Sequence, residues 1–149
     1  MNDDPPYIDA WGYLLRVHAE VIARVEAALA EQNEISLTWY DVLLSLENAP
    51  AKRLRMSELA KAIVLSRSAL TRSVDKLEQQ GYLRRERCEQ DDRGAYATLT
   101  KRGERAIVRA RPIYWAAVKK FFGSPLNASE IATLIGVLRK VREGLGQVG

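Results

Sequence analysis

A polar face recurs at helical spacing between residues 66 and 80. When this segment is drawn as a helix of 3.6 residues per turn, hydroxyl groups and cations gather on one side, namely Ser68, Thr71, Arg72 and Lys76. The opposite side is apolar and holds Leu70, Val74 and Leu77. Arginine pairs with guanine through two hydrogen bonds, and serine and threonine bind bases or phosphates. These residue types predict a helix that lies in the major groove of DNA, with an ordinary amphipathic surface helix as the alternative.

The start of the same helix adds further hydrogen-bond donors. Ser66 is placed to cap it, and Arg67 follows in the first turn, where the N-terminal residues of a recognition helix meet base edges. The free N–H groups and the positive end of the dipole at a helix start also favour a phosphate. The charge of Asp75 fits DNA contact poorly. We expect it to orient Arg72 at i,i+3 or to accept a hydrogen bond from cytosine.

Four arginines surround a predicted β-hairpin that follows this helix: Arg84, Arg85, Arg87 and Arg93. An arginine at a hairpin tip can enter the minor groove, where the potential is most negative when the groove is narrow. Asp91 is expected to hold Arg93, or a strand arginine such as Arg87, in one geometry. A solvated charged hairpin without a DNA role is the alternative.

The distribution of charge supports the same interpretation. The chain has 149 residues and a net charge of +4, but residues 52–111 alone contain 16 Lys/Arg and 8 Asp/Glu. A basic centre between acidic ends is the electrostatic pattern of a nucleic-acid surface, although many such stretches are only solvated faces.

Apolar periodicity predicts the helices that precede this region. A helix over residues 10–32 carries one apolar stripe, which consists of Trp11, Leu14, Leu15, His18, Val21, Ile22, Val25 and Leu29. A second helix is capped by Ser36 or Thr38 and stops before Pro50. A short helix over residues 57–64, with Ser57 as its cap, and a turn at Leu65 lead to the polar-faced helix, which Gly81 closes. Two helices joined by a tight turn form a helix-turn-helix.

The remainder of the chain predicts a hairpin and two helices. Residues 82–87 and 95–99 alternate as strands around a polar turn at 89–94. Thr100 caps a helix that reaches about Phe122, and a Gly-Ser-Pro break separates it from a last helix capped by Asn127 or Ser129. The fold class is therefore mainly α with a small β wing.

Three segments together resemble the MarR family of bacterial regulators. They are LTWYDVLLSL (37–46), MSELAKAIVLSRSALTRSVDKLEQQGYLRRE (56–86) and DDRGAYATLTKRG (91–103). The resemblance covers about residues 10–145. It implies one domain over 1–149, with a winged helix-turn-helix lobe at about 35–100 and N- and C-terminal dimerisation helices at about 8–32 and 101–146.

The resemblance also implies a function and roles for matching residues. The chain would be a sequence-specific transcriptional regulator, most often a repressor, that binds double-stranded DNA with a pseudo-palindromic operator as a homodimer. Arg93 would enter the minor groove with Asp91 as its partner, Lys76 would hold phosphate, and the major groove would be contacted by Arg67, Ser68, Thr71 and Arg72.

The resemblance further implies an effector. Many members of the family release DNA when a small aromatic acid binds between the dimerisation helices and the DNA-binding lobe. Candidates for contact with such an aromatic or phenolic ligand are Trp11, His18, Trp39 and Tyr40, although an aromatic stripe at helical spacing is usually core. The apolar surface for dimerisation would come from Trp115, Phe121, Phe122, Leu126, Leu134 and Leu138.

Other classes of protein fit less well. The sequence has no phosphate-binding glycine loop, no nucleophile with a plausible base and no metal-ligand set, so we expect neither an enzyme nor a cofactor. Cys88 is the single cysteine, and a redox role for it is a minor alternative. No apolar run approaches the roughly 18 residues of a membrane span, and the acidic N-terminus is unlike a signal peptide, so a cytoplasmic protein is expected. The remaining alternative is a winged-helix adaptor that binds proteins, which would need apolar anchors on the polar-faced helix.

Overall fold

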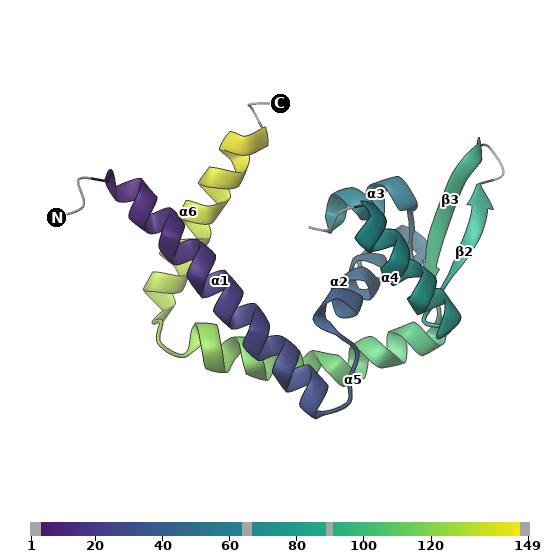
Figure 1. Cartoon of the computed structure of the whole chain (residues 1–149), viewed down its shortest axis with the longest axis horizontal. Coiled ribbons are helices and arrows are strands. Elements are labelled where there is room, and N and C mark those ends of the chain that lie inside the picture. Colours follow the sequence, from purple (N-terminus) through teal and green to yellow (C-terminus); the bar gives the residue numbers. More distant parts are fainter. Residues whose placement is uncertain (1–3, 64–66, 89–90, 147–149) are drawn as a thin grey trace. The chain divides into compact units, whose positions relative to one another are not determined.

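The computed structural model describes residues 4–63, 67–88 and 91–146. Within them, the chain is mainly helical with a small antiparallel sheet, as predicted (Figure 1). The elements in chain order are α1 (Pro6–Glu31), α2 (Leu37–Glu47), η1 (Pro50–Lys52), β1 (Arg53–Arg55), α3 (Met56–Ala62), α4 (Arg67–Gln79), β2 (Leu83–Cys88), β3 (Asp91–Leu99), α5 (Lys101–Val118), η2 (Lys119–Gly123) and α6 (Ala128–Gly146). They form two compact units: the lobe, residues 25–114, and the terminal unit, residues 1–24 with 115–149.

The lobe has a continuous apolar core. It is formed by buried side chains of α2, α3, α4, β2 and α5, among them Tyr40, Val42, Leu43, Leu46, Leu59, Leu70, Val74, Leu77, Leu83 and Ile107. The three apolar residues predicted for the inner face of α4 are at most 2% exposed, so that prediction is confirmed. Burial of one face fixes which side of α4 remains available to a partner.

Local hydrogen bonds set the ends of the helices. The Ser36 hydroxyl accepts from the Trp39 N–H at 3.2 Å and caps α2, and the Thr100 hydroxyl accepts from the Gly103 N–H at 3.1 Å at the start of α5. Gly81 has a φ of +74°, and the N–H groups of Gly81 and Tyr82 donate to carbonyls of the last turn of α4. This is a Schellman motif, which favours glycine because its positive φ costs other residues strain.

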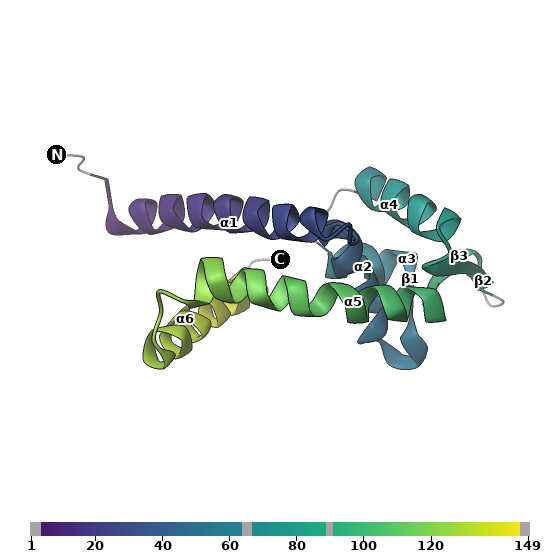
Figure 2. The same cartoon turned by 90° about the horizontal axis from the view of Figure 1, so that it is seen from below.

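The wing is a three-stranded antiparallel sheet of order β1-β3-β2. Figure 1 shows β2 and β3 as a hairpin beside α4, and Figure 2 shows β1 next to α3, which follows it directly in the chain. The sequence did not predict β1, which is three residues long and pairs with residues 96–98 of β3. The predicted polar turn at 89–94 was too long, because β3 begins at Asp91.

Two predicted helix starts were wrong. The third helix begins at Met56 rather than after a cap at Ser57, because the Glu58 carboxylate accepts from the Arg55 N–H at 2.9 Å and ends the preceding strand there. It also stops at Ala62, before the predicted end at residue 64. The first helix begins at Pro6, four residues earlier than predicted, since proline suits the first turn of a helix. The predicted cap Ser66 and turn residue Leu65 lie outside the described residues.

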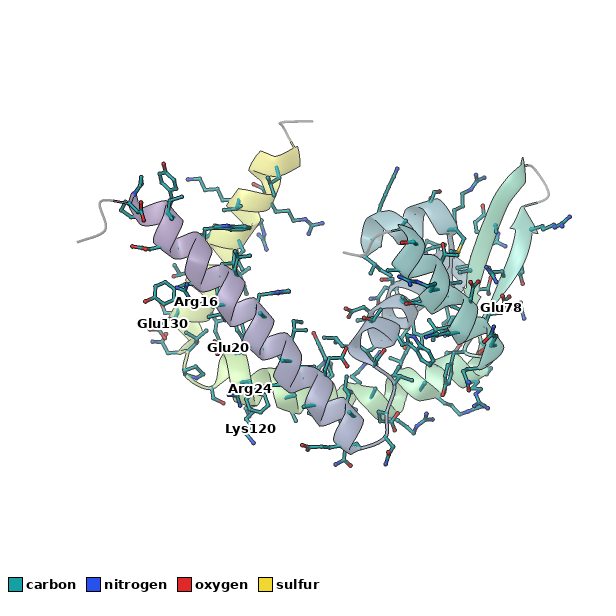
Figure 3. All side chains as sticks on the ribbon, in the orientation of Figure 1. Arg16, Glu20, Arg24, Glu78, Lys120 and Glu130 are labelled. Atoms are coloured by element: carbon teal, nitrogen blue, oxygen red, sulfur yellow. The ribbon has the colours of Figure 1, made fainter. Side chains whose placement is uncertain are left out.

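The terminal unit contains most of α1, the end of α5, η2 and α6. Asn127 and Glu130 cap α6 reciprocally, with the Asn127 side chain accepting at 3.0 Å and the Glu130 carboxylate at 2.8 Å. Arg24 and Lys120 both lie over the Phe121 ring, at 5.2 and 5.1 Å. Figure 3 shows Arg16, Glu20 and Arg24 following one another along α1. In the part of the chain that the structure describes, no single helix is long and apolar enough to cross a membrane. Only residues 101–123 and 128–146 taken together, bent by 96°, meet that length and composition.

Candidate nucleic-acid interface

The outer face of α4 carries the polar groups that the sequence placed there. Ser68, Thr71, Arg72 and Lys76 are all exposed, on the side opposite the buried leucines and valine. Among the described residues of α4, none of the exposed side chains is a large apolar one. Arg67 begins the helix, but its side chain, like Ser66, is outside the described residues. The face therefore presents donors suited to DNA rather than apolar anchors suited to a protein groove.

An open cleft adjoins this face. It has a volume of about 310 Å³ and is lined by two residues of α2 and four of α4: Thr38, Trp39, Ala69, Arg72, Ser73 and Lys76. The sequence placed Arg72 and Lys76 in a DNA interface but gave no sign that α2 would join them. The position of α2 against α4 depends on core packing between residues more than 20 positions apart, which no local pattern reveals.

Arg85 pairs with two carboxylates of α4 on the surface of the lobe. Its guanidinium lies 2.8 Å from Asp75 and 2.7 Å from Glu78, and its backbone N–H donates to Glu78 at 2.8 Å. Figure 3 shows Glu78 on α4 near the base of the hairpin. The hydrogen bond from the Arg85 backbone, together with its guanidinium, lowers the pKa of Glu78. The expected pairing of Asp75 with Arg72 is thus replaced by a link between α4 and β2.

The hairpin presents its other arginines differently. Arg87 is exposed, and Arg84 pairs with Glu86 at 2.6 Å, which lowers the pKa of Glu86. Asp91 and Arg93 lie in β3, but their side chains, and that of Cys88, are outside the described residues. The expected pairing of Asp91 with Arg93 therefore stays a prediction.

A group of aromatic and basic side chains on the sheet was missed from the sequence. The guanidinium groups of Arg53 and Arg55 lie 4.8 and 5.5 Å from the Tyr96 ring, and Arg55 Nε donates to the Tyr96 hydroxyl at 3.3 Å. The signal was present in the basic residues of β1. It could not be used without knowing that this short segment pairs with β3.

Several cations of the basic centre are neutralised within the lobe. Glu104 accepts from Lys52 at 2.9 Å and from Lys101 at 3.1 Å, Arg109 pairs with Glu34 at 3.1 Å, and Arg111 pairs with Glu47. Three of these pairs join α5 to other parts of the lobe, namely η1, the segment between α1 and α2, and α2, while the pair of Lys101 with Glu104 lies within α5. Part of the positive charge of residues 52–111 is consequently compensated by ion pairs within the lobe, whereas Arg72 and Lys76 of α4 stay exposed.

The four candidate ligand residues divide between the two units. Trp11 and His18 belong to the terminal unit, and both are exposed, Trp11 by 57%. Trp39 and Tyr40 belong to the lobe, where Tyr40 is buried against Tyr114 with ring centroids 4.9 Å apart. Trp39 is partly exposed and meets the edge of Tyr82 at 6.0 Å. Tyr40 is therefore a core residue, while the other three are accessible.

Comparison with known proteins decides the family. The MarR family model matches residues 34–94. An uncharacterized HTH-type transcriptional regulator from Bacillus cereus is 30% identical over 110 residues, which is 74% of this chain and 71% of that protein. The chain belongs to the MarR family. MarR-family regulators are DNA-binding transcription factors, so the chain is a winged-helix transcriptional regulator.

Solved MarR-family structures match nearly the whole chain. AbsC from Streptomyces coelicolor has a TM-score of 0.85 at 28% identity, with 97% of each chain covered. Sco3205 from the same organism, solved in complex with DNA, has a TM-score of 0.83 at 32% identity, with 91% of this chain and 86% of that chain covered. The likeness extends beyond the segment that the family model matches, to both units of the fold.

Proposed function

We propose that this MarR-family protein is a homodimeric, sequence-specific DNA-binding repressor whose α4 enters the major groove of a pseudo-palindromic operator. The observation that carries the proposal is the exposed face of α4, where hydroxyl groups and cations stand opposite a fully buried apolar face. The similar protein Sco3205 was solved in complex with DNA, which supports DNA as the partner of this face.

Each site residue has a proposed role. The major groove is contacted by Ser66, Arg67, Ser68, Thr71 and Arg72, while Lys76 binds a phosphate. Arg93 enters the minor groove with Asp91 as its partner, and Arg87, which is exposed, binds the backbone beside it. Arg85 contributes differently from its neighbours. Because its guanidinium is already engaged by Asp75 and Glu78, its role is to hold the hairpin against α4.

The proposed homodimer forms through the helices at about residues 8–32 and 101–146. In a single chain, none of the described residues of α6 is buried. Large apolar side chains of α1 and α6 are exposed, among them Trp11, Leu14, Leu15, Ile131, Ile135, Leu138, Val141 and Leu145. Two helices with this much exposed apolar surface need a partner, and a second copy of the chain supplies the same surface in return. The dimer would bring two copies of α4 to two half-sites.

A small aromatic acid is the proposed signal that releases DNA. Three of the candidate residues are accessible and offer stacking surfaces and one titratable donor, namely Trp11, His18 and Trp39. Tyr40 is buried and would affect the effector only indirectly, through core packing. Addition of benzoate is expected to lower operator affinity. Operator affinity that does not change across millimolar aromatic acids would remove the effector from the proposal and leave DNA binding intact.

Selection of bound duplexes from a random DNA pool, at moderate salt with excess competitor, tests the central proposal. We expect enrichment of an inverted repeat, which would identify both sequence preference and two-fold symmetry. A folded dimer that enriches no sequence would contradict the proposal and favour a protein-binding adaptor.

The wing assignment has its own test. Arg93→Ala is expected to weaken operator binding by about 1–3 kcal/mol without changing the unfolding midpoint, since the proposed loss is that of a groove contact. Unchanged operator affinity would reject the minor-groove role of Arg93.

A further inference from the structure

The cleft between α2 and α4 is a second polar surface on the lobe, adjacent to the base-contacting face of α4. From α4 it takes residues 69, 72, 73 and 76, which share one helical face at i, i+3, i+4 and i+7. From α2 it takes Thr38 and Trp39 in the first turn. The roles proposed above account for Arg72 and Lys76 and offer Trp39 to an effector, but they give the α2 side of the cleft no role in DNA binding.

The chemistry of the cleft favours an oxyanion. Its lining offers two cations, two hydroxyl groups and one indole N–H, and none of the described residues that line it is acidic. The two acids of α4, Asp75 and Glu78, are both paired with Arg85 at 2.8 and 2.7 Å. Among the described residues, no acid forms an ion pair with Arg72 or Lys76. Within the described part of the lobe, the positive charge of the cleft is therefore not compensated by an ion pair.

The shape of the cleft indicates the source of that oxyanion. The cleft is open to solvent, whereas sites for small molecules usually enclose most of their ligand. The Trp39 and Tyr82 rings form a T-shaped contact with centroids 6.0 Å apart, and the Arg102 guanidinium lies over the Tyr82 ring at 5.2 Å. An open cleft with one side formed by the packed Trp39 ring suits a segment of a polymer that passes through it.

We propose that this cleft binds a backbone phosphate of the DNA strand that flanks the half-site contacted by α4. Lys76 pairs with the non-bridging oxygens, and the Thr38 hydroxyl and the Trp39 indole N–H donate to the same phosphodiester. Arg72 keeps its contact in the major groove at the border of the cleft. The inference rests on the proposed function. It extends the DNA surface from α4 to α2 and makes Thr38 and Trp39 sequence-independent contacts, which fix the position of α4 on the duplex.

The first test adds a negative charge to the cleft. Thr38→Glu lies in the first turn of α2, where a carboxylate suits the helix dipole, so the variant is expected to fold with an unchanged unfolding midpoint. The affinity of the Thr38→Glu variant for DNA should fall at least about tenfold, equally for the selected operator and for a scrambled duplex. The log–log slope of affinity against salt should become shallower by about 0.9, the value for one phosphate contact.

Asn48→Asp is the matched control, because it adds the same charge at an exposed position at the opposite end of α2, outside the cleft and about 15 Å from Thr38 along the helix axis. The affinity of this variant for both duplexes should stay within about twofold of the wild type, since a distant exposed charge is screened. If Thr38→Glu and Asn48→Asp behave alike, or if Thr38→Glu weakens only the operator complex, the inference is wrong.

Neutral methylphosphonates placed one at a time in the operator locate the contact. At the phosphate that enters the cleft, the substitution should weaken the wild type but not Thr38→Glu, because the added carboxylate no longer faces a negative group. The absence of any phosphate with this coupling would overturn the proposal.

A competition experiment separates the two sources of an oxyanion. If the cleft instead binds a free carboxylate, benzoate should release DNA from the wild type but not from Thr38→Glu, which would itself retain full DNA affinity. That outcome overturns the phosphate site and leaves the proposed function standing. Failure of the wild type to enrich any duplex sequence would instead be a failure of the proposed function.

Discussion

The lobe and the terminal unit use the same apolar pattern with opposite results. In α4 of the lobe, Leu70, Val74 and Leu77 are at most 2% exposed. In α6 of the terminal unit, Ile135 and Leu138 repeat the helical spacing but are 51% and 41% exposed. An amphipathic pattern therefore states that one helical face must be covered, but it does not state whether the same chain or another copy covers it.

The contrast continues along α1, which contributes to both units. Val25 and Leu29 are buried in the lobe, while Trp11, Leu14 and Leu15 are exposed in the terminal unit. One helix thus contains a stretch whose apolar side chains are buried in the lobe and a stretch whose apolar side chains are exposed in the single chain. We expect mutations in the two stretches to separate folding from assembly.

Leu77→Ala should have the largest effect on folding. Removal of a fully buried leucine leaves a cavity in the lobe, and we expect the free energy of unfolding to fall by about 2–5 kcal/mol. Chemical denaturation followed by circular dichroism measures it. Leu138→Ala is the matched control from the terminal unit. At protein concentrations below the dimer dissociation constant, it should leave the free energy of unfolding of the lobe unchanged. Equal losses in both variants would show that the two regions do not differ in this way.

Leu138→Glu should break assembly instead of folding. A carboxylate placed in an apolar dimer interface loses its hydration, so we expect the dimer dissociation constant to rise about 100-fold, or about 2.7 kcal/mol. Sedimentation across a concentration series measures it. Gln80→Glu adds the same charge at an exposed site of the lobe, outside both proposed dimerisation segments, and should leave the dimer intact. Loss of the dimer with Gln80→Glu, or retention of it with Leu138→Glu, would contradict the proposed interface.

Gly103→Ala tests the close packing within the lobe. An added Cβ would lie 2.1 Å from the Tyr82 carbonyl oxygen and 2.6 Å from a Leu99 methyl group, so the first turn of α5 must shift. We expect a loss of about 1–3 kcal/mol in unfolding free energy. Gly136→Ala in α6 has nothing within 4 Å of the added Cβ and should be neutral or stabilising. A destabilised α6 variant would indicate tighter packing of that helix than a single chain shows.

Glu78→Gln should have the smallest effect, because the pair with Arg85 is partly exposed. The pKa of Glu78 is lower in the folded than in the unfolded state, so ionised Glu78 stabilises the fold. This stabilisation is fully present above the unfolded-state pKa and is lost as pH falls through the folded-state pKa. We expect the free energy of unfolding of the wild type to exceed that of the variant by less than about 1 kcal/mol near neutral pH. The difference should vanish under acidic conditions, and high salt should reduce it. Denaturation midpoints from pH 7 to pH 3 measure it, and a difference that grows on acidification would contradict the assignment.

Local chemistry predicted much of this protein. Ser36, Thr100 and Asn127 cap the helices that they were expected to cap, and Gly81 ends α4. The hydroxyl and cationic face of α4 was also predicted. Each of these features depends on residues within a few positions of one another, where side-chain and backbone hydrogen bonds compete directly and leave a readable pattern.

Contacts between distant segments were decided only by the tertiary structure. β1 exists because it pairs with a strand about 40 residues later, and Asp75 meets Arg85 instead of its helical neighbour because the hairpin returns against α4. The cleft joins Thr38 to Lys76 through core packing. The sequence by itself therefore determined the helices, their polar faces and the family. The tertiary structure decided which charges are paired and which stay exposed on the lobe, because charges pair through space and local sequence records only near neighbours.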